Sequence, residues 1–134
     1  MSDPHPLEVL ELDYIHFKFF ENYVFSTIQD GVAFTKNNLE EVSAILNDFY
    51  KGNPFVSIAL RNYDYTIAPT CFHEDSIVNG LLGIGVVCYG ESAYNTSIFE
   101  KAFYKGIYEV FYSLEECIQW AQQLYNDSIK KAGL

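Results

Sequence analysis

The fold of this chain is decided by the stretch Phe55-Val56-Ser57-Ile58-Ala59-Leu60, which Arg61 follows directly. The run shows almost no alternation with polar residues, which is typical of a strand covered on both faces of a sheet. Residues 83–89 form a second apolar run and indicate another buried strand by the same argument. Two such strands, separated by helical patterns, favour an α/β fold.

The N-terminal part of the chain predicts a hairpin. Residues 8–20 and 23–28 are both rich in strand-forming residues. Within the first segment, Ile15, Phe17 and Phe19 would share one face of the strand, because successive side chains point to opposite faces. The turn between the two segments is short, so these strands are expected to pair antiparallel.

Capping residues mark the start of two helices. Thr35 is a suitable N-cap for a helix that runs to about Tyr50. Ser113 with Glu116 forms a capping box in front of the last helix. A further helix is expected at residues 92–104, with an apolar stripe that should face the sheet. The stripe consists of Ile98, Phe99, Ala102 and Phe103.

The order of elements defines the architecture. A short helix is expected from Pro69 to about Val78, and a last strand at residues 107–112. The order is then β-β-α-β-α-β-α-β-α, in which single helices between strands imply parallel pairing. We therefore expect an α/β fold with a mixed five-stranded sheet and about four helices. Residues 8–134 should form one domain after a disordered tail at residues 1–7.

Charge and composition exclude several classes of function. The chain has 134 residues and a net charge of −10, from 18 acidic and eight basic residues. Nucleic acid is not an expected partner, because binding to phosphates needs clustered lysine and arginine. No apolar run is long enough to span a membrane, and the N-terminus lacks a signal pattern, so a cytoplasmic protein without membrane insertion is expected. The aromatic share of 17% indicates either a core of large rings or a ring-lined cleft or interface.

No pattern for a metal, a cofactor or catalysis emerges. The densest group of possible ligands, Cys71-Phe72-His73-Glu74-Asp75, is consecutive in sequence, so its side chains would point in different directions. Cys88 and Cys117 lie in apolar patterns and are expected to be small core residues. We expect no metal, no cofactor and no enzymatic activity.

The candidate site follows the first buried strand. It consists of Arg61, Asn62, Tyr63 and Tyr65. In open α/β sheets, ligands bind at the carboxyl ends of the strands, and a guanidinium needs an anionic partner there. One interpretation is an internal ion pair, for example with Asp64 or Glu74. The other is an acidic ligand or partner held beside the tyrosine rings.

Three segments carry a family resemblance: His16-Phe17-Lys18-Phe19-Phe20-Glu21-Asn22-Tyr23-Val24, then Asp30-Gly31-Val32, then the pattern Arg61-Asn62-x-x-Tyr65-x-x-x-Pro69. Together they resemble small, uncharacterised bacterial proteins described as SpoIIAA-like, or as STAS/CRAL-TRIO-type domains. The resemblance covers residues 8 to about 125. It implies a mixed five-stranded sheet with packed helices.

The two branches of this family imply different functions. STAS domains of the anti-sigma-factor-antagonist type are phosphorylation switches, with an Asp-Ser pair where a central strand enters its helix. Arg61-Asn62 stands at that junction here, and Asp75-Ser76 lies further along, so Ser76 does not inherit the phosphoserine role. CRAL-TRIO relatives hold a lipid in a large apolar pocket, and a chain of this length leaves room for a shallow apolar groove.

The first hypothesis for function is a non-enzymatic regulatory or protein-interaction module of STAS-like type. Its partner would be another protein or a second copy in a homodimer. The alternative is a binding domain for a small apolar or acidic, lipid-like ligand, with Arg61 at the strand-end crevice.

Overall fold

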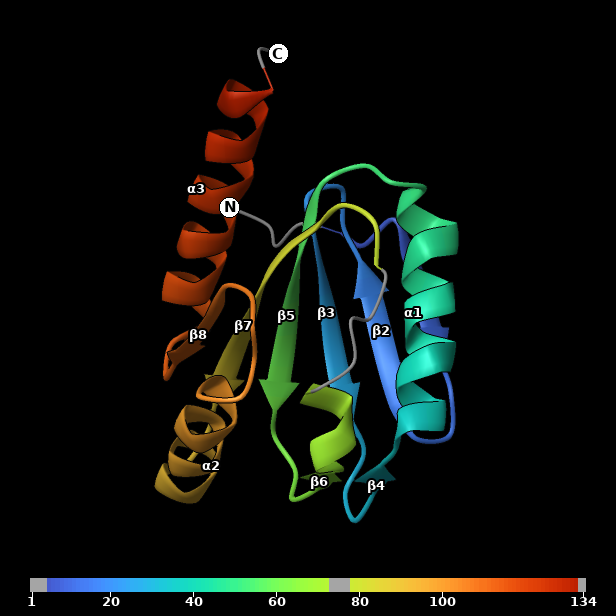
Figure 1. The fold of residues 1–134 in the computed structure, drawn as a ribbon, viewed down its shortest axis with the longest axis vertical. Coiled ribbons are helices and arrows are strands. Elements are labelled where there is room, and N and C mark those ends of the chain that lie inside the picture. The colour runs from blue at the N-terminus through green and yellow to red at the C-terminus, as the bar shows by residue number, and fades with distance from the viewer. Residues whose placement is uncertain (1–4, 73–77, 133–134) are drawn as a thin grey trace.

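The computed structural model describes residues 5–72 and 78–132 and has a six-stranded main sheet (Figure 1). In spatial order its strands are β1 (Glu8–Glu11), β2 (Ile15–Phe19), β3 (Tyr23–Ile28), β5 (Phe55–Arg61), β7 (Leu81–Cys88) and β8 (Tyr108–Phe111). A separate two-stranded sheet pairs β4 (Ala33–Phe34) with β6 (Thr66–Ile67). The helices are α1 (Lys36–Tyr50), α2 (Glu91–Lys101), α3 (Leu114–Lys131) and the 3₁₀ turn η1 (Pro69–Phe72).

Two element counts differ from the sequence prediction. The expected strand at residues 8–20 is divided, because Leu12 N donates to Ile15 O over 2.9 Å and closes a turn between β1 and β2. The main sheet therefore has six strands, not five. The expected helix at residues 69–78 is the short turn η1, and residues 73–77, with Glu74 and Asp75-Ser76, lie outside the described part of the chain.

The mixed sheet itself is confirmed. β1 pairs with β2 and β2 with β3 antiparallel, whereas the pairs β3–β5, β5–β7 and β7–β8 are parallel. The arrowheads of β5 and β7 consequently point to the end of the molecule where α2, β4 and β6 lie (Figure 1). This is the edge at which an α/β sheet presents its ligands.

The helices cover the sheet unequally. Phe55 packs against α1, and its neighbour Val56 packs against α3. Because neighbouring residues of a strand point to opposite faces of the sheet, these two helices lie on opposite faces. Val86 packs against α2, whereas Val87 lies in the cluster with α3. Helices α1 and α2 therefore share one face of the sheet. On the other face α3 packs over β5, β7 and β8.

Helix α1 forms as its sequence predicts. The Thr35 side chain accepts from Asn38 N, and the Asn38 side chain accepts from Thr35 N, which closes a capping box. Val42, Leu46 and Tyr50 are buried on its inner face. The Tyr50 hydroxyl donates to the carbonyls of Phe20 and Tyr23 at 2.8 and 2.9 Å, which ties the end of the helix to the β2–β3 turn.

Helix α3 lies very close to strand β7. A Cβ added at Gly85 would stand 2.7 Å from Cys117 Sγ and 2.8 Å from Trp120 Cζ3, so this position has room only for hydrogen. Cys88 and Cys117 are buried, as predicted for small core residues. Within residues 5–72 and 78–132, no helix combines the length and apolar character needed to cross a membrane.

Candidate functional site

Arg61 lies at the carboxyl end of β5, as the sequence predicts, but its charge is matched inside the fold. The side chain is 5% exposed. Its Nη1 lies 2.6 Å from Oε1 of Glu100, and its Nη2 lies 3.3 Å from Oε2 of the same residue. Nη1 also donates to Ser97 Oγ over 3.0 Å. The internal ion pair that was one interpretation therefore exists, with Glu100 on α2 in place of Asp64.

The surroundings keep the Arg61 guanidinium charged and the neighbouring Tyr65 phenol neutral. Burial opposes the charge on Arg61, but the hydrogen bond to Glu100 and the electrostatic attraction of Tyr65, Glu100 and Tyr108 together outweigh that effect, so the pKa of Arg61 is raised above its ordinary value. The guanidinium carbon lies 4.5 Å from the centre of the Tyr65 ring. Burial raises the pKa of Tyr65 to about 12, so this phenol remains protonated at neutral pH. Among the described residues, every buried side-chain nitrogen and oxygen has a hydrogen-bond partner.

The ion pair requires an orientation of α2 that the sequence analysis predicted wrongly. Ser97 and Glu100 are buried and face the sheet. The stripe expected to be buried is outside instead: Ile98 is 43%, Phe99 67% and Phe103 46% exposed, and Ala102 is also exposed. At about 100° per residue, the direction of Ser97 and Glu100 lies about 160° from the centre of the expected stripe, so the helix presents nearly its opposite side to the sheet.

An apolar groove borders the outward side of α2. This α2 groove has a volume of about 390 Å³ and runs between α2 and residues 65–72. Its walls include Tyr65, Phe72 and Phe99, and Arg61 and Glu100 close its floor. The rings of Phe99 and Phe103 meet edge to face, with centroids 5.1 Å apart. Because the two floor charges neutralise each other, the groove favours apolar groups.

The four predicted site residues do not form one site. Arg61 and Tyr65 line the α2 groove. Asn62 and Tyr63 line a second hollow of about 600 Å³, bordered by the β2–β3 hairpin and by Leu114 and Ile118 of α3. The alternation of side chains along β5 explains the division, since Leu60 and Arg61 point to opposite faces of the sheet. We call the second hollow the hairpin groove.

Sequence reasoning missed Ser97 and Glu100 because both lie in a helix whose apolar residues suggested another inner face. One signal for their role was present. Ser97 and Glu100 are three positions apart and therefore lie on the same side of a helix. A buried arginine on a strand needs such a face opposite it, but nothing local in the sequence specifies which helix provides it.

Comparison with known proteins supports the fold. No family model matches this chain, and no curated protein matches it. Among solved structures, the chain is similar to an uncharacterized protein of the DUF3478 family with a SpoIIAA-like fold from Shewanella loihica PV-4. It superposes with a TM-score of 0.53 at 13% identity, over 90% of this chain and 98% of that one. The resemblance to SpoIIAA-like domains is therefore confirmed at the level of the fold.

Proposed function

We propose that this chain is a non-enzymatic protein-interaction module of STAS-like type, and that it docks its partner on the outward side of α2. One observation carries this proposal: α2 directs Ser97 and Glu100 inward and leaves Ile98, Phe99 and Phe103 outside. A SpoIIAA-like fold is consistent with a regulatory or interaction module. The fold alone does not decide function, so the proposal depends on the surface.

The surface has the properties of an interaction hot spot. Phe99 and Phe103 line a groove of about 390 Å³ that apolar side chains of a partner can enter. Contiguous exposed apolar patches of more than a few hundred Å² are uncommon on monomeric proteins and mark binding sites. Large side chains that become buried in a partner's pocket contribute most of the binding energy in such interfaces.

The Arg61–Glu100 pair has a positioning role in this proposal. A buried ion pair is weak evidence for stability, but it can select one arrangement among alternatives. Here the pair favours the rotation of α2 that exposes Phe99. The opposite rotation would leave the Arg61 guanidinium buried without a carboxylate partner. Tyr65 supports the pair from below and also lines the groove.

The partner is inferred to be a different protein with an apolar segment flanked by lysine or arginine. Apolar side chains of that segment would enter the α2 groove, whose floor has no net charge. The basic flanks follow from the net charge of −10 on this chain. Two copies of the chain would repel each other at long range for the same reason, which disfavours a homodimer.

Site-specific photocrosslinking tests the docking surface. A benzophenone amino acid is placed at position 99 of the full chain, in cells that naturally produce the protein. Position 119 on α3, where exposed Gln119 stands, serves as the matched control. We expect one partner to crosslink from position 99 and not from position 119. The identified partner is then purified, and its Kd is measured by calorimetry.

The purified pair gives the decisive comparison. Phe99→Ala should weaken binding at least about tenfold, as expected for an aromatic hot spot, whereas Gln119→Ala should leave the Kd unchanged. Equal crosslinking from both positions would contradict the proposed surface. A crosslinked product that contains only this chain would instead show self-association, and the homodimer would replace the second protein.

A further inference from the structure

The hairpin groove, on the face of the sheet opposite α2, has an aromatic floor. Phe20, Tyr23 and Phe25 form a compact cluster there, with ring centroids 5.0 Å apart for Phe20–Tyr23 and Phe20–Phe25 and 5.3 Å for Tyr23–Phe25. Ile118 of α3 forms one side wall. The groove exists because α3 packs over β5, β7 and β8 and leaves this part of the sheet uncovered.

A positive charge stands at the edge of this floor. Lys18 of β2 is exposed, lines the groove, and pairs in register with Val9 on one side and Phe25 on the other. Within the described part of the chain, its ammonium makes no hydrogen bond or ion pair. Its neighbours across the strands are apolar, so the charge is available to an anionic ligand.

Polar groups occupy the end of the groove nearest the carboxyl edge of the parallel strands. Asn62 offers an amide there, and Tyr63 a hydroxyl. Glu11 is the acidic residue that lines the groove. It lies opposite His16 in the β1–β2 register, two pairs along from Val9 and Lys18 and on the same face of the sheet. The carboxylate of Glu11 therefore faces the imidazole of His16 more directly than the ammonium of Lys18. The arrangement combines an apolar, ring-lined body with a basic and amide-bearing edge.

We infer that the hairpin groove binds a small aromatic carboxylate. The aromatic ring of the ligand would lie against Phe25 and Ile118, and its carboxylate would pair with Lys18. A volume of about 600 Å³ falls in the ordinary range for small-molecule sites. The inference is independent of the proposed partner surface, because the two grooves lie on opposite faces of the sheet.

Three matched probes test the chemistry of the site: naphthalene-2-carboxylate, the neutral alcohol 2-naphthalenemethanol and the cation 2-naphthylmethylamine. Binding to the full chain is measured by calorimetry, and the site is mapped by chemical shift changes of backbone amides. We expect saturable binding of the carboxylate, with shifts at Lys18 and Phe25. The carboxylate should bind about fivefold more tightly than the alcohol, the upper range for an exposed ion pair.

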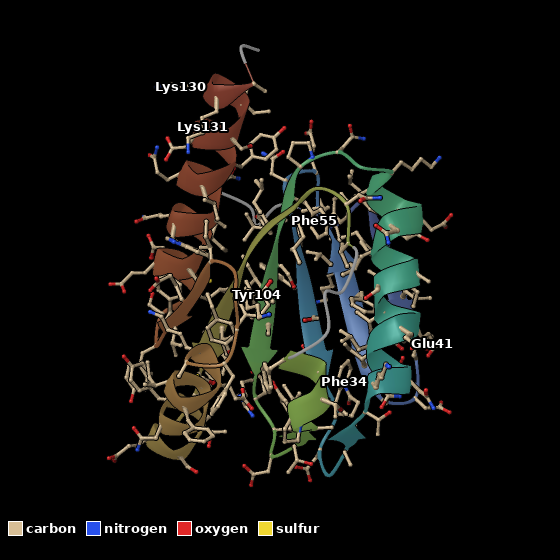
Figure 2. The ribbon with its side chains drawn as sticks, viewed as in Figure 1. Phe34, Glu41, Phe55, Tyr104, Lys130 and Lys131 are labelled. Atoms are coloured by element: carbon tan, nitrogen blue, oxygen red, sulfur yellow. The ribbon has the colours of Figure 1, made fainter. Side chains whose placement is uncertain are left out.

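Variants separate the charge from the apolar surface. Lys18→Gln should remove the preference for the carboxylate and leave alcohol binding unchanged. Lys130→Gln makes the same charge change at the far end of α3 and should have no effect (Figure 2). Thr27→Trp, on a strand residue that lines the groove, should project an indole into the hollow next to Phe25 and weaken binding of all three probes. Circular dichroism checks that each variant folds.

Three outcomes would overturn the inference. The first is an absence of saturable binding for the carboxylate. The second is equal affinity for the carboxylate, alcohol and amine, which would leave an apolar groove without charge selection. The third is binding whose affinity Thr27→Trp leaves unchanged or that shifts amides of α2 instead, which would place the probe in the α2 groove.

Discussion

Helices α1 and α2 lie on the same face of the sheet and use their side chains in opposite ways. Helix α1 buries Val42, Leu46 and Tyr50 against β2, β3 and β5. Helix α2 buries Ser97 and Glu100, and leaves Phe99 at its surface. Figure 2 shows the labelled Phe55 and Tyr104 in the middle of the molecule, and the labelled Glu41 of α1 on its outer side.

The difference shows that the strand beneath a helix decides which side of the helix is buried. Beneath α1 the sheet presents Val24 and Phe55, so an apolar side chain gains most by facing inward. Beneath α2 the end of β5 presents Arg61. A buried guanidinium without a carboxylate would cost more than the burial of one phenylalanine gains. The polar side of α2 is consequently the one that packs.

The largest effect on stability is expected when the charge beneath α2 is removed. Arg61→Ala leaves the Glu100 carboxylate buried without its partner, and we expect the free energy of unfolding to fall by about 3–5 kcal/mol. Urea denaturation at neutral pH measures it. The double substitution Arg61→Met with Glu100→Leu removes both charges and should restore stability to within about 1 kcal/mol of the natural chain. A cost below about 1 kcal/mol for Arg61→Ala would contradict the role of the pair.

A second test compares one apolar residue from each helix. Leu46→Ala in α1 removes a buried side chain and should cost about 2–5 kcal/mol, measured by thermal or urea unfolding. Phe99→Ala in α2 removes a larger side chain, but that ring is 67% exposed, so the change should stay within about 0.5 kcal/mol. Similar losses for both variants would show that Phe99 is buried in solution.

The smallest expected effect concerns the first turns of the two helices. Thr35 caps α1 through its side chain, whereas Gly90 at the same position of α2 makes no such hydrogen bond. Thr35→Ala should therefore destabilise the chain by about 1 kcal/mol. Gly90→Ser should stabilise it by a few tenths of a kcal/mol, because a Cβ at Gly90 meets no atom within 4 Å. A loss of stability for Gly90→Ser would mean that α2 does not begin at Glu91.

Local signals predicted most of the elements. Thr35 and Ser113 placed the starts of α1 and α3, and both side chains accept the capping hydrogen bonds. The apolar run at residues 55–60 gave β5 within one residue. The division of the first strand was missed, because the strand-forming residues at 8–20 continue through the turn and conceal it.

The candidate site was harder to predict than the elements. Its residues were chosen because they follow one strand in sequence, yet successive residues on a strand serve different faces. Arg61 and Tyr65 therefore border one groove, and Asn62 and Tyr63 the other. The apolar stripe of α2 was equally misleading, because the hydrophobic pattern of a helix cannot report a charge on a distant strand.

The sequence by itself determined the alternation of helices with the central strands, the parallel pairing of those strands and the arginine at the end of β5, but not the division of the first strand or the β4–β6 sheet. Those features depend on periodicity, caps and turns, which act over a few residues. Only the tertiary structure decided that Glu100, 39 residues from Arg61 along the chain, would neutralise it and rotate α2. That outcome depends on the cost of burying an unpaired charge, and this cost arises only when the two segments meet.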